Sequence, residues 1–256
     1  MLELKDFQPY YYRNLVRRGS TNDGGYLLPS DVSAQFLISL GLGDDWKFEL
    51  ALIKYQQVSE FIVFDHSVTL LNLVKKLFPR KFKLEAYIYR IIVLVRYLRD
   101  FTLFNNFHIK KKVTRDGSIK NFSEISLVEI FKDYIDDSQS TIILKIDIEG
   151  HEYEIIEQIL KLSSQILVLI IEFHEILKMK EKFKSSLEQL KSSFILIHTH
   201  ANNYGKINEY SIPDMCEFTF INMNMYATNK KVSKLPQIGL DSPCTPGRPD
   251  YEMIFD

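Results

Sequence analysis

Five apolar segments that each end in a polar or small residue constrain most strongly how this chain of 256 residues can fold. Near-continuous apolar sequence is typical of strands that are buried on both faces, as they are in parallel sheets. The segments are Phe36 to Gly41, Phe61 to Asp65, Ile142 to Asp147, Ile166 to Glu172 and Phe194 to His198. A weaker strand is expected at Phe107 to Val113, between the second and the third of them.

Helical sequence separates these strands, at Lys47 to Gln57, Glu152 to Leu162 and Glu175 to Lys191. We therefore expect an α/β fold with a doubly wound, mostly parallel, seven-stranded sheet. Cys216 to Met223 supplies the last strand. The loop before it, His200 to Met215, is too short for a helical crossover, so we expect this strand to be antiparallel and at the edge of the sheet.

We expect a single domain over residues 1–256, with an N-terminal cap at about 1–33 and a basic helical insertion at about 70–105. Its cations stand among aliphatic and aromatic residues and are Lys75, Lys76, Arg80, Lys81, Lys83, Arg90, Arg96 and Arg99. The pattern fits a packing helix whose cations reach solvent. It also fits a substrate lid, a dimer face in a homo-oligomer or a contact with an anionic surface.

The composition disfavours several classes of protein. With 32 Lys and Arg against 33 Asp and Glu the net charge is -1, so no global field attracts nucleic acid. Cys216 and Cys244 lack the CxxC spacing of a zinc or redox site, which favours a reducing compartment. The N-terminus has no apolar signal core, and no apolar run reaches membrane-spanning length. We expect a cytoplasmic protein without an integral membrane segment and without a nucleic-acid partner.

The loop after the first strand predicts a ligand site, because ligands bind outside the carboxyl ends of strands in open α/β sheets. Gly41 and Gly43 permit a sharp turn and close approach of the backbone to a ligand. Asp44 and Asp45 would repel a pyrophosphate at the following helix N-terminus, so a dinucleotide is disfavoured. S-adenosylmethionine, with a sulfonium and an ammonium, suits these carboxylates. Asp65 would accept hydrogen bonds from its ribose, although all three aspartates also suit simple capping roles.

Polar pairs close three successive strands: Asp147 with Glu149, Glu172 with His174, and His198 with His200. Neighbouring parallel strands would bring these side chains into one cleft. A histidine beside a carboxylate suits proton removal from a hydroxyl, which makes His174 or His198 the candidate general base. Alternatively, Asp147, Glu172 and a histidine hold a divalent ion, or the histidines only satisfy buried strand ends.

Seven segments of the sequence resemble S-adenosylmethionine-dependent methyltransferases of the FkbM type. They are Asp23 to Tyr26, Leu37 to Glu49, Phe64 to Ser67, Leu144 to Ile156, Ile170 to Glu175, His198 to Gly205 and Leu240 to Pro246. The most specific is LKIDIEGHE within Leu144 to Ile156. The resemblance implies a Rossmann-like class I methyltransferase that acts on a small polar acceptor, a sugar or glycan precursor of surface polysaccharide.

The resemblance also implies site residues. Gly41, Gly43 and Asp65 would bind the cofactor, and Asp116, which follows the expected strand Phe107 to Val113, would contact the adenine. Ser39 departs from the pattern, because many methyltransferases carry there an acidic residue that reaches the methionine end of the cofactor. Asp44 or Asp147 is expected to compensate.

Three loops and two other functions complete the expectations. Tyr26 in the DGGY turn would close the site if that turn folds over the strand ends, and the amides of Asn202 and Asn203 would bind a polyhydroxylated substrate. Asp241 would approach the same edge. The alternatives to a methyltransferase are a metal-dependent hydrolase that uses Asp147, Glu172 and His198, and a cofactor-binding protein without catalysis.

Overall fold

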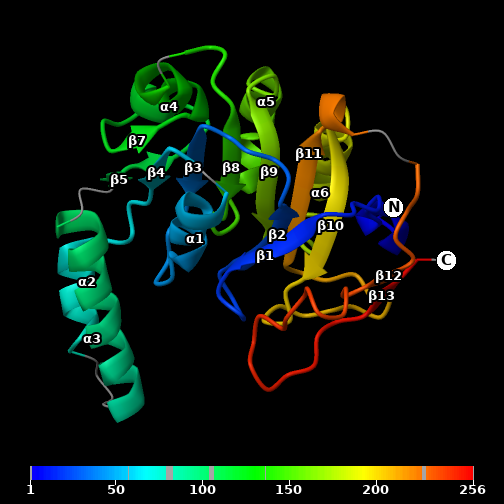
Figure 1. Ribbon diagram of the computed structural model, residues 1–256. Coiled ribbons are helices and arrows are strands. Elements are labelled where there is room, and N and C mark those ends of the chain that lie inside the picture. The colour runs from blue at the N-terminus through cyan, green and yellow to red at the C-terminus, as the bar shows by residue number, and fades with distance from the viewer. Residues whose placement is uncertain are drawn as a thin grey trace.

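A seven-stranded, mostly parallel sheet forms the centre of the protein, which we describe from a computed structural model (Figure 1). The structure describes residues 2–56, 58–78, 83–103, 107–135, 137–226 and 229–255. The strand order is β10-β11-β9-β8-β3-β4-β5. The strands are β3 (Phe36–Leu40), β4 (Glu60–Phe64), β5 (Phe107–Ile109), β8 (Ile142–Ile146), β9 (Ile166–Phe173), β10 (Phe194–Ala201) and β11 (Cys216–Asn222). The predicted doubly wound architecture is confirmed.

The antiparallel strand is present, but its predicted place at the edge is wrong. β11 pairs antiparallel with β9 on one side and with β10 on the other. The edge strand is therefore β10, and β11 separates it from β9. Because neighbouring strands lie about 4.8 Å apart, the insertion moves the end of β10 to about twice that distance from β9.

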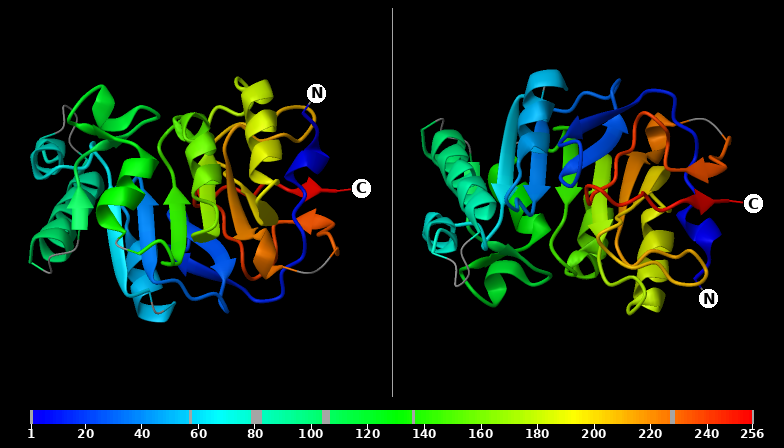
Figure 2. Two further views of the ribbon diagram at one scale, coloured as in Figure 1. Left: turned by 90° about the horizontal axis from the view of Figure 1, so that it is seen from above. Right: turned by 90° about the horizontal axis from the view of Figure 1, so that it is seen from below.

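Helices cover both faces of the sheet (Figure 2). Successive residues of each strand point to opposite faces, so strands that are apolar throughout need helices on both sides to bury their side chains. Ile38 and Leu40 of β3 belong to the core that residues of α4, α5 and α6 also form, whereas Leu37 belongs to the core on the side of α1 and α3. The helices are α1 (Lys47–Tyr55), α2 (Leu70–Lys76), α3 (Leu84–Leu98), α4 (Leu127–Tyr134), α5 (Ile156–Lys161) and α6 (Lys180–Leu190). Both faces therefore carry a continuous apolar core.

Short strand pairs lie outside the main sheet. β1 (Leu15–Gly19) and β2 (Gly25–Pro29) form an antiparallel hairpin within the segment expected to be an N-terminal cap. β6 (Lys112–Val113) pairs with β7 (Glu124–Ile125), and β12 (Lys234–Leu235) pairs with β13 (Met253–Ile254). The strand expected at Phe107 to Val113 is thus two separate strands, and only β5 belongs to the central sheet.

The basic insertion forms α2, α3 and a π-helical turn at Arg99–Leu103, and its helices project from the β5 side of the sheet (Figure 1). α3 buries Val93 and Tyr97 against the body. Its opposite face leaves apolar side chains exposed, at Leu84, Ile88, Ile92 and Val95. Arg80 and Lys81, counted with the basic residues of this segment, lie outside the described residues. Within the described ranges, every helix is too short or too polar to cross a bilayer.

Phe218 on β11 tests the packing of the inserted strand. Its ring is fully buried and lies 5.8 Å from the Phe173 ring and 5.7 Å from the Phe183 ring, measured between centroids. We expect Phe218→Ala to lower the free energy of unfolding by about 3 to 5 kcal/mol in urea titrations, because it leaves a cavity. Phe122→Ala, at an exposed position, should change it by less than about 0.5 kcal/mol. Equal effects of both substitutions would contradict this packing.

Candidate functional site

Three cavities open at the carboxyl edge of the sheet, and Asp147 lines all of them. The first, of about 310 Å³, lies between Gly41, Asp65 and the loop after Asp147. The second, of about 90 Å³, lies between the glycine loop and the N-terminal hairpin. The third, of about 310 Å³, is lined by Asp23, Asp147, Glu149, Glu172, His174, Asn202, Tyr204 and Met215. A pocket of about 300 Å³ is large enough to hold a small organic ligand.

The glycine loop touches the end of β8. Gly41 has a φ of +89°, and a Cβ atom on it would lie 1.8 Å from the carbonyl oxygen of Asp147. Its amide donates to the carbonyl of Phe64 at 2.9 Å, and the amide of Asp147 donates to the carbonyl of Leu40 at 2.8 Å. Only glycine fits this position, both for its positive φ and for the missing side chain.

Asp65, which follows β4, holds the glycine loop from the other side. Its Oδ2 accepts hydrogen bonds from the amides of Leu42 at 2.9 Å and Gly43 at 3.4 Å. Its Oδ1 accepts from the amide and the hydroxyl of Ser67, both at 2.7 Å. Burial opposes ionisation, but these donors outweigh it and lower the pKa of Asp65. An ionised carboxylate therefore faces the first cavity, with its charge shared with the loop.

Two predicted cofactor residues, Asp44 and Asp116, do not line the first cavity. Asp44 pairs with Lys76 of α2 at 2.7 Å and lines only the small second cavity. Asp116 pairs with Lys120 and lies outside the three cavities. β5 ends at Ile109, four residues earlier than the expected strand, which accounts for the position of Asp116 outside these cavities. The residues that line the first cavity from this part of the chain are Lys111, Lys112 and Val113.

The sequence IDIEGHE folds into a tight loop around Glu152. The Oε1 atom of this fully buried carboxylate accepts hydrogen bonds from the amides of Ile148 and Gly150, both at 3.1 Å. Glu149 is held with a φ of 54°, a left-handed conformation that is uncommon for a residue with a side chain. The loop thereby places the exposed Glu149 carboxylate beside Asp147, between the first and the third cavity.

Glu172 and His174, at the end of β9, form one wall of the third cavity. Asn202 donates its side-chain amide to the Oε1 atom of Glu172 at 2.8 Å. His174 places Nδ1 3.0 Å from Glu152 Oε1 and Nε2 3.5 Å from Glu149 Oε2. The expected meeting of these two polar pairs is therefore present in the structure.

The charges of this wall differ from those of isolated groups. Burial raises the pKa of Glu172 well above its usual value, and the nearby carboxylates of Asp147 and Glu217 raise it further. Burial works against an imidazolium at His174, but the hydrogen bond with Glu152 and the charge of Glu172 raise the pKa of His174 to about 9. His174 is therefore protonated at neutral pH. It does not have the charge state of the predicted general base.

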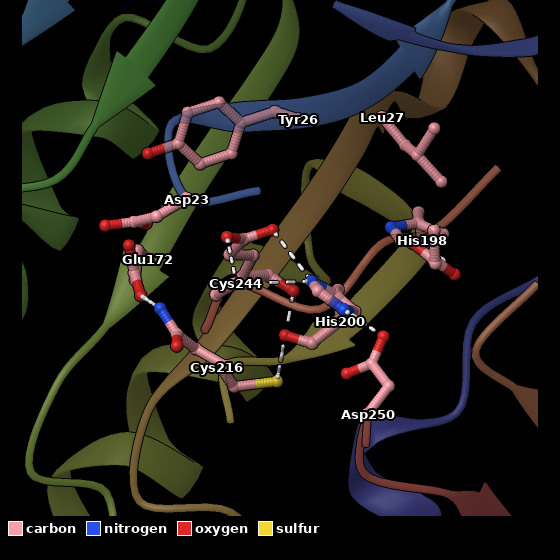
Figure 3. A network of polar contacts seen from close by, with 12 residues as sticks. Asp23, Tyr26, Leu27, Glu172, His198, His200, Cys216, Cys244 and Asp250 are labelled. Carbon is pink, nitrogen blue, oxygen red and sulfur yellow. Dashed lines mark hydrogen bonds and ion pairs between the residues drawn. The ribbon is translucent and has the colours of Figure 1, made fainter. Parts of the chain in front are cut away.

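The third polar pair does not reach the cavity, so its expected place in one cleft is wrong (Figure 3). His198 pairs with Asp241 at 3.1 Å. His200 pairs with Glu217 at 3.2 Å through Nδ1 and with Asp250 at 2.9 Å through Nε2. The physical reason is β11, which stands between β9 and β10. Both histidines are buried, and their partners Asp241 and Asp250 come from the C-terminal part of the chain.

Two acidic residues that were not predicted from the sequence, Glu217 and Glu49, also lie near the site. Glu217 lies directly opposite Glu172 in the β11–β9 register. The strand Phe194 to His198, with its histidine, was expected at this place beside β9. Glu49 of α1 is 1% exposed and accepts a hydrogen bond from Ser39 Oγ at 2.7 Å. The sequence signal for Glu49 was weak: it is an acidic residue next to Phe48 in an otherwise largely apolar helix. Tyr26, whose role was expected, donates its hydroxyl to Asp147 Oδ2 at 3.2 Å and closes the edge.

Among the described residues, two groups of side chains have donor atoms close enough to hold a metal ion. Asp147, Glu149 and His174 form one, and the buried His200, Glu217 and Cys244 form the other, with all donor atoms of a group within 4.8 Å of one another. Glu172, expected among the ligands, belongs to neither group. Ligation at the first group requires loss of the His174 proton, because a histidine binds a metal in its neutral form.

Comparison with known proteins agrees with this architecture. The model of the methyltransferase FkbM domain matches residues 72–210, which include Asp147, Glu172 and His174 but not the glycine loop or Asp65. No curated protein matches the sequence.

Several solved structures are similar to the chain. A fibrillarin pre-rRNA processing protein of Methanococcus jannaschii has 12% identity and a TM-score of 0.40, over 77% of this chain and 70% of that chain. Precorrin-6y C5,15-methyltransferase of Geobacter metallireducens has 11% identity and a TM-score of 0.37, over 74% and 80%. TrmK of M. capricolum, in complex with S-adenosyl-homocysteine, has 11% identity and a TM-score of 0.34, over 84% and 72%.

The raised pKa of His174 predicts how stability depends on pH. The folded-state pKa of about 9 exceeds the usual 6.5, so the imidazolium stabilises the fold fully below about pH 6.5. This contribution is lost as the pH rises through 9. We expect the difference in unfolding free energy between the wild type and His174→Gln to shrink from pH 6 to pH 10 in urea titrations of chelator-treated protein. A constant difference, or an NMR titration of His174 near pH 6.5, would contradict the assignment.

Proposed function

Because the chain belongs to the FkbM methyltransferase family, we propose that it transfers a methyl group from S-adenosylmethionine to a hydroxyl of a small polar acceptor, a sugar or glycan precursor of surface polysaccharide. The observation that carries the proposal is the position of Asp147. It lines the two cavities of about 310 Å³ and the cavity of about 90 Å³, so a cofactor and an acceptor would meet at this residue.

The first cavity fits the adenosine part of the cofactor. Gly41 leaves the wall open where a side chain would collide with Asp147, and Asp65 offers a carboxylate beside the cavity for the ribose hydroxyls. The apolar side chains of Phe64, Val113 and Ile148 line the same space and suit a flat base. The acidic loop suits the positive charge of the cofactor, which supplies an electrophilic methyl group when bound.

The third cavity fits an uncharged, polyhydroxylated acceptor. Asp23, Asp147, Glu149 and Glu172 line it. Carboxylates accept hydrogen bonds from hydroxyls, and Glu172, whose raised pKa favours the protonated form, can also donate one. The carboxylates of Asp147 and Glu149 repel a phosphate, which disfavours a nucleic-acid backbone inside this cavity. Tyr204, 75% exposed at the rim, offers an aromatic face to a sugar ring.

Asp147 is the proposed base. Bound S-adenosylmethionine would supply the methyl group to the acceptor oxygen, with the electron pair of the broken carbon–sulfur bond left on sulfur, and Asp147 would take the proton of the acceptor hydroxyl. The acceptor oxygen becomes strongly acidic during this step, so an ordinary carboxylate is sufficient to take its proton. Tyr26 and Lys145 lie against Asp147 Oδ2, at 3.2 Å and 3.5 Å, and orient the carboxylate.

A divalent ion is a second possibility for activating the acceptor. Asp147, Glu149 and His174 would hold it, and the ion would lower the pKa of a bound hydroxyl. A cytoplasmic location and a homo-oligomer, both expected from the sequence, stay predictions.

Asp65→Ala tests the cofactor cavity. We expect the dissociation constant for S-adenosylhomocysteine, measured by calorimetric titration, to rise about 10- to 100-fold, because hydrogen bonds to a charged acceptor contribute about 1.5 to 3 kcal/mol. Asp116→Ala is the matched control, because Asp116 lies outside the cavities, and should leave affinity unchanged. NADH should not bind the wild type. Equal affinity in Asp65→Ala and the wild type would exclude this cavity.

Asp147→Asn tests the proposed base. We expect the kcat for methyl transfer to a panel of free and nucleotide-linked sugars to fall about 10²- to 10⁴-fold, while affinity for S-adenosylhomocysteine changes little. Glu149→Gln and treatment with EDTA should leave the rate nearly unchanged if Asp147 acts without a metal. Loss of activity in both controls would instead support the ion at Asp147, Glu149 and His174. An undiminished rate in Asp147→Asn would refute the role of Asp147 altogether.

A further inference from the structure

The glycine loop lacks an acidic residue at Ser39, and both residues expected to compensate have other roles: Asp44 forms an ion pair, and Asp147 is the proposed base for the acceptor. Asp44 pairs with Lys76 at 2.7 Å, and its carboxylate is partly exposed. Asp147 accepts from Tyr26 at 3.2 Å and from Lys145 at 3.5 Å. A third carboxylate lies next to Ser39 itself.

Glu49, in the first turn of α1, brings this carboxylate from the helix to the end of β3. Ser39, which is fully buried, donates its hydroxyl to Glu49 Oε1 at 2.7 Å. The other oxygen, Oε2, is buried and has no hydrogen-bond partner in the part of the chain that the structure describes. A buried carboxylate with one unsatisfied oxygen is costly, so this arrangement calls for a donor that the protein does not provide.

The cavity beside Glu49 is small and acidic. It has a volume of about 90 Å³, and its lining includes the carboxylates of Asp23, Asp44, Asp45, Glu49 and Asp147. Asp45 is occupied by Lys47 at 3.4 Å and Arg96 at 3.3 Å. Lys145 is the cation in the lining, and its Nζ donates to the carbonyl of Gly41 at 2.8 Å. The cavity therefore favours a small cationic group next to Glu49.

We propose that Glu49 binds the α-ammonium group of the amino-acid end of S-adenosylmethionine, and so supplies from helix α1 the acidic group that Ser39 lacks on the strand. The inference rests on the proposed function, since it identifies where one end of that cofactor lies. The terminal torsion of a glutamate is broad, so a small turn of the carboxylate presents Oε2 to the cavity. This turn moves both oxygens, so the Ser39 hydroxyl would turn with Oε1 to keep its hydrogen bond. Lys145, which lines the same cavity, would face the carboxylate of this amino-acid end.

Three ligands separate this contact from the rest of the site. 5′-Methylthioadenosine keeps the adenosine and lacks the amino-acid end, and the deaminated analogue of S-adenosylhomocysteine lacks only the ammonium. By calorimetry, Glu49→Gln should weaken S-adenosylhomocysteine about 10- to 100-fold and leave methylthioadenosine unchanged. The wild type should bind S-adenosylhomocysteine at least about 10-fold more tightly than the deaminated analogue, a comparison that needs no variant to fold.

The controls distinguish the possible failures. Glu188→Gln, on the exposed side of α6, should bind all three ligands like the wild type. The double substitution S39D/E49Q returns the acid to the strand and should recover most of the lost affinity. Suppose that the wild type binds S-adenosylhomocysteine and the deaminated analogue equally well, and that Glu49→Gln binds S-adenosylhomocysteine as tightly as the wild type does. The role of Glu49 is then refuted and the proposed function stands. If the wild type binds none of the ligands, the proposed function fails.

Discussion

The contact between Gly41 and the carbonyl of Asp147 is the constraint on which the rest of the site depends. Backbone hydrogen bonds from Gly41 to Phe64 and from Asp147 to Leu40 join the ends of β3, β4 and β8. A Cβ at Gly41 would lie 1.8 Å from the Asp147 carbonyl oxygen, so any side chain there would separate these ends. The contact keeps the glycine loop, Asp65 and Asp147 at one edge, where three cavities share Asp147.

The fold could be predicted from the sequence because its strands are apolar on both faces and its helices fall between them. The position of β11 could not. A strand such as Cys216–Asn222 pairs equally well at an edge or between two others as far as its own residues show. The choice depends on its buried aromatic side chains, of which Phe218 packs against Phe173 and Phe183 from other elements. This single pairing decides that His198 and His200 lie away from the cavity.

The candidate site was partly predictable for a related reason. Asp147 directly follows β8, and Glu172 and His174 lie at the end of β9. These two strands are consecutive in the main sheet and pair in parallel, so the meeting of the three side chains follows from the parallel arrangement. Glu49 and Glu217 enter from a helix and from the antiparallel strand, and only tertiary packing brings them to Ser39 and Glu172. The charge of His174 was equally hidden, because it depends on burial and on Glu152 in a loop folded back upon itself.

We propose that the cavities around Asp147 form one continuous site for a cofactor and its acceptor. A crystal structure of the protein with S-adenosylhomocysteine tests this claim most directly. We expect the adenosine in the cavity between Gly41 and Asp65, the amino-acid end beside Glu49, and the sulfur next to Asp147, facing the cavity lined by Glu172. Adenosine bound elsewhere, or a sulfur separated from Asp147 by other side chains, would contradict it.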